Sequence, residues 1–468
     1  MKKYLLIFYS LLYCINCFSQ NKIQNLEKAF NNLLTDEQAK HAMASLCVLD
    51  ANTGKILFAK NEQVGLATAS TLKTITAASA FSILGKDFQF QTTLGYSGNI
   101  TADGTLKGNI IIIGSGDPTL GSWRYQNKEN AVLSQWVAAI KAAGIKKIDG
   151  AIIGDDRIFG TQTTPEGWVW QDIGNYYGAG TSGLAWRENQ FDIHLRPGSS
   201  TSADVTLVKT VPITPYIQIK NELKTGASGT GDRSYAFLPP YSNLAYLRGS
   251  WGIGISKSSI SVALPDPAFD CAFRLQDTLK RLGIETNQQP TTTRLMELSK
   301  ISVPAISQKI STITSPSLSE ITYWFLKKSV NLYGETLLKT MALKSGKPAT
   351  TAKGVETEIN FWASKGIDKS ALNIIDGSGL SPGNKITTSA MADILFQIQK
   401  EAWFPDFEKA LPNYNGMKIK SGTINDVSAF AGYHTNTAGD KFVIVININN
   451  YSGSGINKKL FKVLDELK

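Results

Sequence analysis

Three short groups of residues in this 468-residue chain combine side chains that serve nucleophilic catalysis. The first is Ser70-Thr71-Leu72-Lys73. On a helix, residues three apart lie on one face, so the Lys73 amine can come within hydrogen-bond distance of the Ser70 hydroxyl. A serine becomes a good nucleophile when a base takes its proton, and a lysine can be that base when burial and a neighbouring cation lower its pKa. Taken alone, the pair also fits a capped helix with an ordinary surface-reaching lysine.

The second group is Ser329-Val330-Asn331. The Ser329 hydroxyl can relay protons between the lysine and a leaving group, and the Asn331 amide can orient a substrate carbonyl. In isolation these residues also fit polar positions near a helix bend.

The third group is Lys420-Ser421-Gly422-Thr423, at the end of a predicted strand. Lys420 supplies positive charge for a carboxylate, the Ser421 hydroxyl donates to the same group, and Gly422 allows a ligand backbone to approach closely. The backbone N–H of Thr423 is a candidate oxyanion donor together with that of Ser70.

The order of the three groups is more specific than any one of them. An S-x-x-K on a helix, an S-x-N and a K-[ST]-G on a strand are together the marks of penicillin-recognising serine acyl transferases. Ser329 lies 259 residues after Ser70, and Lys420 lies 91 residues after Ser329. The first separation is too long for one compact domain and predicts a large insertion between the first two motifs.

The chain resembles the D-alanyl-D-alanine carboxypeptidase/endopeptidase family, the low-molecular-mass class C penicillin-binding proteins, over essentially its whole mature length. Further family-like stretches occur in order: 48–58, 114–120, 167–184, 331–338 and 376–381. The resemblance implies an α/β fold with a transpeptidase-like (β-lactamase-like) domain, in which helices flank an antiparallel sheet, and a two-domain insertion.

The same resemblance implies roles for individual residues. Ser70 is the expected acylated nucleophile and Lys73 its base, while Ser329, Asn331 and Lys420 complete the catalytic set. Ser421, Gly422 and Thr423 are expected to bind substrate. Pro382 departs from the family, which commonly has Arg there to hold a diaminopimelate side chain. Candidates for that pocket, which equally fit domain-core packing, are Trp170, Asp172 and Tyr177.

The elements that must position these groups follow from periodicity and composition. Residues 70–84 predict a buried helix that begins at Ser70, and helical spacing recurs over 318–343 and 355–363. The chain ends in a strand, strand, strand, helix pattern. The expected domains are a signal peptide at 1–19, a catalytic domain at 20–90 plus 288–468, an inserted domain at 91–194 plus 263–287, and a nested β domain at 195–262.

Composition and charge narrow the class of protein. Lys2-Lys3, an apolar run over 4–18 and Ser19 predict a secretory signal peptide, with a lipoprotein acylated at Cys17 as the alternative. The net charge of +10 loses two lysines with this leader and is spread without an Arg-rich block, so we expect no nucleic-acid partner. Three scattered His residues and four Cys form no metal-binding pattern, and we expect neither metal nor cofactor. Of the two mature cysteines, Cys47 is expected to be a buried free thiol.

The function predicted from these features is a penicillin-sensitive serine D-Ala-D-Ala carboxypeptidase/endopeptidase of the periplasm or cell envelope. Its expected partners are peptidoglycan stem peptides and covalently bound β-lactams. The alternatives are a serine β-lactamase and a non-catalytic peptidoglycan-binding protein of the same fold. Carboxypeptidase or endopeptidase preference, the third-position residue of the stem peptide and a homodimer remain open.

Overall fold

A computed structural model describes residues 22–468, and the predicted leader lies outside these residues. The chain forms two compact units. Unit 1 consists of the chain up to Ser79, Thr322–Ser329 and Glu358–Lys468, and unit 2 consists of Ala80–Ile321 and Val330–Thr357. The finer domain boundaries expected from the sequence stay a prediction.

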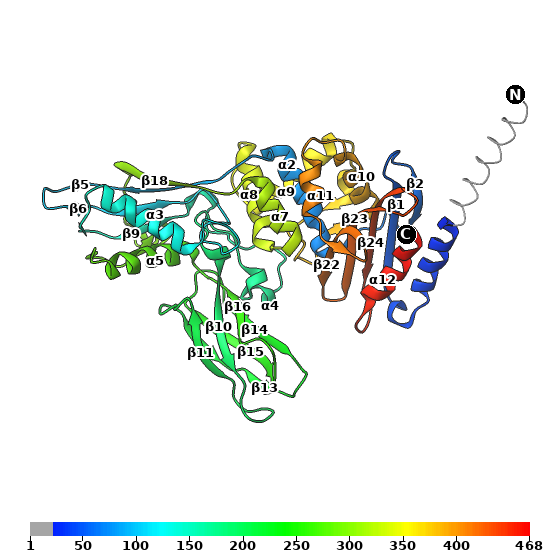
Figure 1. Ribbon diagram of the computed structural model, residues 1–468, viewed down its shortest axis with the longest axis horizontal. Coiled ribbons are helices and arrows are strands. Elements are labelled where there is room, and N and C mark those ends of the chain that lie inside the picture. Colours follow the sequence, from blue (N-terminus) through cyan, green and yellow to red (C-terminus); the bar gives the residue numbers. More distant parts are fainter. Residues whose placement is uncertain (1–21) are drawn as a thin grey trace, which may run out of the picture. The chain divides into compact units, whose positions relative to one another are not determined.

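Unit 1 is built on a six-stranded sheet in the order β2-β1-β24-β23-β22-β21 (Figure 1). Every neighbouring pair is antiparallel, as predicted for the catalytic domain. The first strands of the chain pair with the last: β1 lies along β24 from Met43 opposite Asn449 to Asp50 opposite Phe442. The strands are β1 (Met43–Asp50), β2 (Ile56–Lys60), β21 (Asn413–Tyr414), β22 (Met417–Ile424), β23 (Val427–Thr435) and β24 (Lys441–Asn449).

Helices cover both faces of this sheet because successive side chains of each strand point to opposite sides. On one face, Leu46 and Ile446 lie in an apolar core with the helical residues 22–34 and with α12 (Ile456–Leu464). On the other face, Ser45 of β1 forms a 2.6 Å hydrogen bond with Thr388 of α10 (Thr388–Ile398). The predicted sheet flanked by helices is therefore confirmed.

The helices near the motifs differ from the sequence prediction at two points. The predicted helix at 70–84 begins one residue earlier, as the 3-10 turn η2 (Ala69–Leu72) followed by α2 (Lys73–Leu84). The prediction of continuous helix over 318–343 is wrong, because Ser329 adopts a left-handed φ of +56° and separates α7 (Leu318–Lys328) from α8 (Asn331–Lys344). A residue in this conformation ends the helical hydrogen-bond ladder. The predicted helix at 355–363 lies within α9 (Thr351–Ser364).

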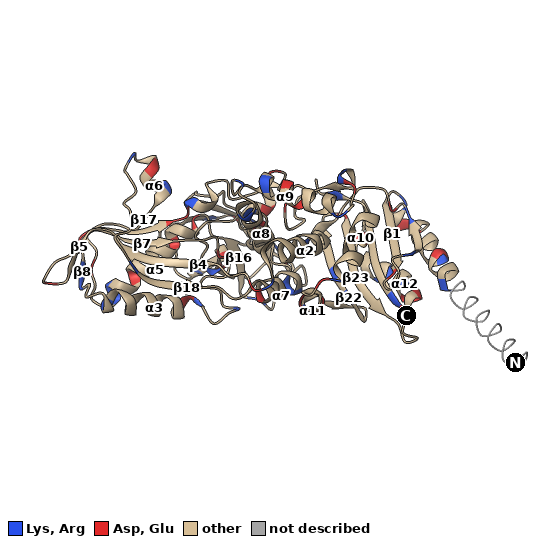
Figure 2. Cartoon of the chain, turned by 90° about the horizontal axis from the view of Figure 1, so that it is seen from above, with Lys and Arg blue, Asp and Glu red and all other residues tan. Residues whose placement is uncertain are grey.

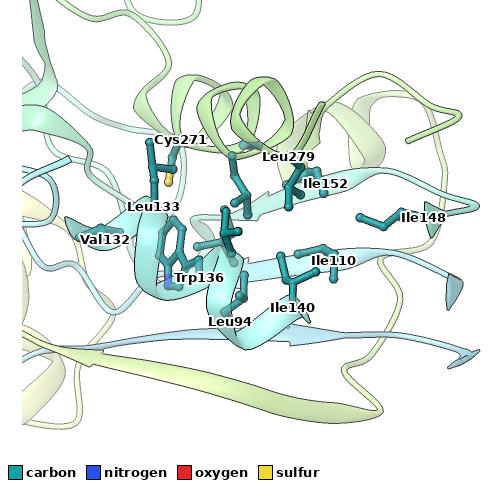
Figure 3. Packing of buried hydrophobic residues seen from close by; sticks show 14 of the residues in the cluster. Leu94, Ile110, Val132, Leu133, Trp136, Ile140, Ile148, Ile152, Cys271 and Leu279 are labelled. Atoms are coloured by element: carbon teal, nitrogen blue, oxygen red, sulfur yellow. The ribbon is translucent and has the colours of Figure 1, made fainter. Parts of the chain in front are cut away.

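Unit 2 contains a five-stranded mixed sheet in the order β17-β9-β7-β4-β18. Its strands are β4 (Gln91–Tyr96), β7 (Ile110–Ile113), β9 (Ile152–Asp155), β17 (Thr291–Thr292) and β18 (Gln308–Thr314). Two helices, α3 (Glu129–Ala142) and α5 (Pro267–Arg281), pack on one face of it. Trp136 and Ile140 of α3 and Leu279 of α5 lie in this apolar core with Ile110 and Ile152 of the strands (Figure 3).

A second apolar core in unit 2 belongs to two small sheets of the region 190–263. Trp251 and Leu247 are among its fully buried members. The strands are β10 (Gln190–Arg196), β11 (Thr206–Val211), β12 (Gln218–Asn221), β13 (Lys224–Gly226), β14 (Asp232–Phe237), β15 (Leu244–Gly252) and β16 (Ser259–Ala263). Among the described residues, no helix is both long and apolar enough to cross a membrane.

Short elements complete the two units. Two further three-stranded sheets are formed by β5 (Asn99–Ile100), β6 (Thr105–Lys107) and β8 (Lys147–Ile148), and by β3 (Leu66–Ala67), β19 (Leu372–Asn373) and β20 (Lys385–Ile386). The remaining helices are α4 (Trp170–Ile173), α6 (Thr293–Leu298) and α11 (Phe404–Ala410), with 3-10 turns η1 (Glu37–Ala39), η3 (Arg157–Phe159), η4 (Tyr176–Gly178), η5 (Arg187–Asn189), η6 (Lys369–Ala371) and η7 (Asp465–Leu467). Basic and acidic residues occur together on α6 and α9, whereas α10 carries no basic residue (Figure 2).

Candidate active site

The first motif places a lysine amine next to a serine hydroxyl at the start of α2. Lys73 Nζ lies 2.8 Å from Ser70 Oγ, as the helical spacing predicts. Ser70 is partly exposed, whereas the Lys73 side chain is fully buried. Nζ also donates a 2.6 Å hydrogen bond to the carbonyl oxygen of Ser378, which fixes the amine beside the hydroxyl. This geometry allows a proton to pass between Oγ and Nζ.

The backbone just before Ser70 is held in an unfavourable conformation. Ala69 has a φ of +44°, which a residue with a Cβ rarely adopts. The chain passes close to Gly379 here, and a Cβ on that glycine would lie 1.8 Å from the Ala69 carbonyl oxygen. Only glycine fits this contact, since Gly379 itself has a φ of +79°.

Gly379 and Ser378 belong to a loop that one buried carboxylate organises. The Asp376 side chain is fully buried and accepts hydrogen bonds from the backbone N–H groups of Gly379, at 2.7 Å, and Ser381, at 2.7 Å. Asn384 donates to the same carboxylate at 3.0 Å. The loop therefore presents the Ser378 carbonyl to Lys73 as a preformed acceptor.

The third motif lies on β22, where Lys420 and Gly422 share the face toward η2. Lys420 is only 2% exposed, and its amine donates to the Ser421 carbonyl at 2.6 Å. Burial and, secondarily, the positive charge of Lys73 hold the pKa of Lys420 well below its usual range. A Cβ on Gly422 would lie 2.9 Å from the Ser70 backbone nitrogen, so β22 runs directly against the turn that carries the nucleophile. The structure thus brings the first and third motifs together within unit 1.

Ser421 is partly exposed beside Gly422, and Thr423 is exposed one residue further along β22. The predicted oxyanion role of the Thr423 backbone N–H stays a prediction.

The second motif is divided between the two units. Ser329 lies in unit 1, in the left-handed link between α7 and α8. Asn331 is the first residue of α8 in unit 2, and its Nδ2 donates a 2.7 Å hydrogen bond to the carbonyl oxygen of Tyr177.

The three pocket candidates of the insertion lie close to one another in α4 and η4 of unit 2. Trp170 is 52% exposed, and its ring centroid lies 6.1 Å from that of Phe237. Burial raises the pKa of Asp172, while a hydrogen bond from Tyr177 lowers it less strongly. Burial also raises the pKa of Tyr177. Pocket formation by these residues stays a prediction.

The described part of the chain holds no cluster of three or more His, Cys, Asp and Glu side chains suited to a metal ion. Cys47 and Cys271 are both buried free thiols, and burial raises their pKa values. The prediction for Cys47 is confirmed.

Comparison with known families identifies the family of this chain. Residues 26–413 match the D-Ala-D-Ala carboxypeptidase 3 (S13) family, a span that includes Ser70, Lys73, Ser329 and Asn331. The chain belongs to the S13 family. The S13 assignment confirms the predicted family.

Curated relatives extend over nearly the whole S13 chain. A D-alanyl-D-alanine carboxypeptidase of Actinomadura sp. (strain R39) is 25% identical over 460 residues, covering 92% of this chain and 82% of the relative. The D-alanyl-D-alanine carboxypeptidase DacB of Haemophilus influenzae is 25% identical over 446 residues, covering 91% and 89%. The fold is that of the crystal structure of penicillin binding protein 4 (dacB) from Haemophilus influenzae, with a TM-score of 0.78 at 23% identity over 95% of this chain and 98% of that one.

Sequence reasoning missed several residues that shape the S13 site. Ser378, Gly379 and Asp376 hold Lys73 and the backbone of Ala69 in place, yet their stretch, 376–381, is noted above only as family-like. The sequence does contain a pattern that could have indicated this loop. Asp376 is followed within three residues by two glycines, a composition typical of a tight turn. The burial of Glu358, an acid on α9, could not be predicted from the sequence, because the burial of a single helical position depends on the tertiary packing.

Proposed function

We propose that this S13 protein is a penicillin-sensitive serine D-Ala-D-Ala carboxypeptidase that acts on peptidoglycan stem peptides through an acyl-enzyme on Ser70. The observation that carries the proposal is the 2.8 Å contact between Ser70 Oγ and a fully buried Lys73 amine, in a chain of this family.

In the acylation step, Ser70 Oγ attacks the carbonyl carbon of the penultimate D-Ala while its proton passes to a neutral Lys73. The carbon–nitrogen bond to the terminal D-Ala then breaks, and the departing nitrogen takes up the proton. Ser329 is placed by its motif to relay that proton. The products of the step are free D-Ala and an ester on Ser70.

In the deacylation step, a water molecule attacks the ester, and the Ser70 oxygen regains a proton as it leaves. The shortened peptide is released with a new carboxyl end. Lys420 favours substrates that end in a carboxylate, because that carboxylate stabilises the protonated form of the buried amine and pairs with it. Endopeptidase activity would follow the same route with the amine of a cross-linked peptide as the leaving group.

A β-lactam meets the same nucleophile. Attack by Ser70 Oγ opens the ring, but the leaving amine stays tethered to the acyl group, so we propose that a long-lived adduct forms. With its leader removed, the protein would meet both substrate and inhibitor in the cell envelope. The residue that holds the stem peptide's third-position side chain, given Pro382, is open to test with defined muropeptides.

The test is incubation with benzylpenicillin followed by mass spectrometry of the intact protein and its peptides, together with D-Ala release from a peptide ending in D-Ala-D-Ala. We expect one adduct, on the peptide that contains Ser70, and D-Ala release that a Ser70→Ala variant lacks. An unmodified Ser70 would contradict the proposal.

The same experiment separates the alternatives. A serine β-lactamase would turn benzylpenicillin over rapidly and leave no lasting adduct. A peptidoglycan-binding protein without activity would bind muropeptides but show neither the adduct nor D-Ala release. Monomeric and cross-linked muropeptides, digested side by side, then separate carboxypeptidase from endopeptidase preference.

A further inference from the structure

An unusual left-handed turn lies in unit 2 at η5. Three consecutive residues without glycine have positive φ angles: Arg187 at +56°, Glu188 at +53° and Asn189 at +51°. Such residues occur singly in most turns, and each is unfavourable unless its surroundings hold it in place. Three in succession therefore need a dense set of contacts.

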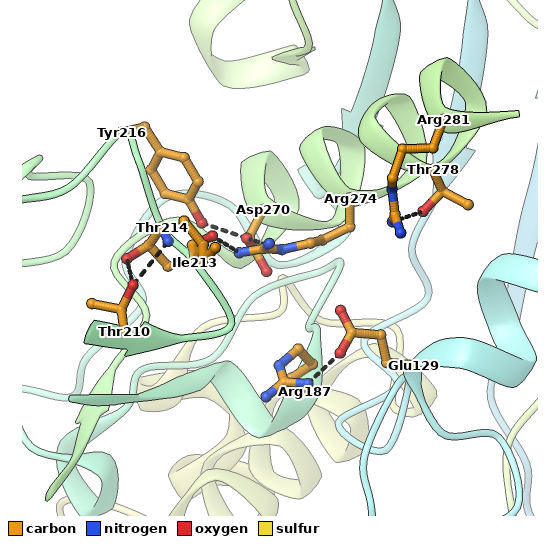
Figure 4. Close-up of polar contacts among 10 residues, drawn as sticks. All are labelled: Glu129, Arg187, Thr210, Ile213, Thr214, Tyr216, Asp270, Arg274, Thr278 and Arg281. Carbon is orange, nitrogen blue, oxygen red and sulfur yellow. Dashed lines mark hydrogen bonds and ion pairs between the residues drawn. The ribbon is translucent and has the colours of Figure 1, made fainter. Parts of the chain in front are cut away.

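The contacts of this turn are strong and mostly buried. The backbone N–H of Arg187 donates to the Leu120 carbonyl at 2.9 Å, and the Arg187 guanidinium pairs with Glu129 (Figure 4). The Asn189 amide donates to the Gly180 carbonyl at 2.8 Å, and its side-chain oxygen accepts from the Trp186 N–H at 3.0 Å.

Glu188, only 1% exposed, points into the interior of unit 2 and gathers three donors on one carboxylate oxygen. Oε1 accepts from Ser122 Oγ at 2.7 Å, from Arg124 Nε at 2.8 Å and from the Tyr333 hydroxyl at 2.8 Å. Burial and, secondarily, the Glu188 charge raise the pKa of Tyr333 well above its usual range, so this hydroxyl stays protonated and donates.

Tyr333 connects the turn to the second motif, because it lies in the first turn of α8, two residues after Asn331. Asn331 Nδ2 in turn holds the Tyr177 carbonyl, three residues before the Gly180 carbonyl that Asn189 binds. Three hydrogen bonds, from Tyr333 to Glu188, from Asn331 to Tyr177 and from Asn189 to Gly180, are connected by short backbone segments. Together they form a closed ring within unit 2 that includes Asn331.

We infer that Glu188 is a positioning residue of the reaction: through Tyr333 it fixes the first turn of α8, and with it the amide of Asn331. The inference rests on the proposed function and on the role expected for Asn331 from its motif, in which its amide orients the substrate carbonyl. Small displacements of an orienting group slow a reaction strongly even when the fold is intact. Glu188 itself is buried away from any substrate and acts only through its partners.

Unit 2 offers a matched control. Asp270, also 1% exposed, accepts a hydrogen bond from the Tyr216 hydroxyl and one of 2.9 Å from Arg274 Nε, the same tyrosine, carboxylate and arginine chemistry as at Glu188 (Figure 4). Its hydrogen-bond partners lie in α5 and near β12, and none lies in α8. Substitution at Asp270 therefore measures what loss of such a buried network costs the fold alone.

The experiment measures the rate of acylation by fluorescent penicillin, kcat and KM for D-Ala release, and the melting temperature. We expect Glu188→Gln and Tyr333→Phe to lower the acylation rate and kcat by about tenfold, with KM changed less. Asp270→Asn and Tyr216→Phe should lower the melting temperature by a similar amount but leave acylation within about twofold of the parent.

A double-variant cycle tests the route through Asn331. Because Glu188 acts by placing that amide, Glu188→Gln should slow acylation no further in an Asn331→Ala background. Acylation of Glu188→Gln and Tyr333→Phe at the rate of the Asp270 control, or a full further loss in the double variant, would overturn the inference while leaving the proposed function intact. A parent protein that penicillin does not label would overturn both.

Discussion

At the scale of single residues, the proposed chemistry depends on what the Lys73 amine can do that another cation cannot. The amine is fully buried and touches both the nucleophile and a backbone carbonyl. A lysine can lose its proton in such a place, whereas an arginine stays charged at any ordinary pH. Replacing Lys73 by arginine therefore tests whether the residue acts as a base or only as a fixed positive charge.

We therefore expect Lys73→Arg to lose acylation almost as completely as Lys73→Met, with both rates lower by about 10²-fold or more. Stopped-flow measurement of penicillin acylation checks this. Lys339→Met is a control, because Lys339 is another buried lysine that donates to a backbone carbonyl, that of Gln162, but unlike Lys73 and Lys420 it lies outside the motifs. Substantial acylation by the arginine variant would show that Lys73 supplies charge and does not act as the base.

At the scale of elements, the close approach of β22 to η2 fixes the nucleophile against the sheet. The approach depends on Gly422, where a side chain would meet the Thr68 carbonyl at 2.6 Å and the Ser70 nitrogen at 2.9 Å. Contacts this short with backbone atoms cannot be relieved by a change of rotamer, so the strand or the turn has to move.

Gly422→Ala is expected to lower the acylation rate by about 10²-fold by displacing Ser70 from its base. The matched control is Gly65→Ala in the same unit, where a new Cβ would meet only the ordinary 3.5 Å contact with Lys385. Rates from fluorescent penicillin labelling, with circular dichroism to confirm folding, check both variants. An acylation rate for Gly422→Ala equal to that of the Gly65 variant would show that the turn tolerates the shift.

The sequence predicts those parts of the site whose chemistry is local. Ser70 and Lys73 are three residues apart on a helix, and Lys420 and Gly422 are two residues apart on a strand. Their spacing alone therefore predicts that each pair shares a face. The left-handed conformations of Ala69 and Ser329 are not predictable in this way, because neither residue type favours them. They are imposed by partners far along the chain, as Gly379 shows for Ala69. For the same reason, the contact between Glu188 and Tyr333, 145 residues apart, leaves no pattern in the sequence.

At the scale of the whole molecule, a buried carboxyl group makes stability depend on pH. Burial raises the pKa of Glu358 to about 8, against a smaller lowering effect of the Ser79 and Thr76 hydroxyls. In the unfolded chain the pKa of a glutamate is about 4.3. Because the folded protein holds this proton more tightly, the stabilisation is complete below about pH 4 and is lost as the pH rises through about 8.

Glu358→Gln keeps the neutral shape of the side chain and removes this dependence. We expect the free energy of unfolding of the parent to fall, relative to that of the variant, by on the order of 4 kcal/mol between pH 5 and pH 9. Urea unfolding across that range measures the difference. Glu356→Gln, at a half-exposed position on the same helix where the acid pairs with Lys353, serves as the control and should run parallel to the parent. Parallel curves for the parent and Glu358→Gln would mean that the acid is already charged in the folded state.

The pairing of β1 with β24 also determines when, during its synthesis, the chain can complete the catalytic sheet. β1 can pair with β2 early, but almost every residue of the protein has to be synthesised before β1 meets β24 on its other side. The turn that carries Ser70 rests against β22, which is also made late. Closing so long a loop is entropically costly and comes late in folding. A growing chain that already contains Ser70 therefore has no acylation activity. The activity appears only after the last strands of the sheet have been synthesised.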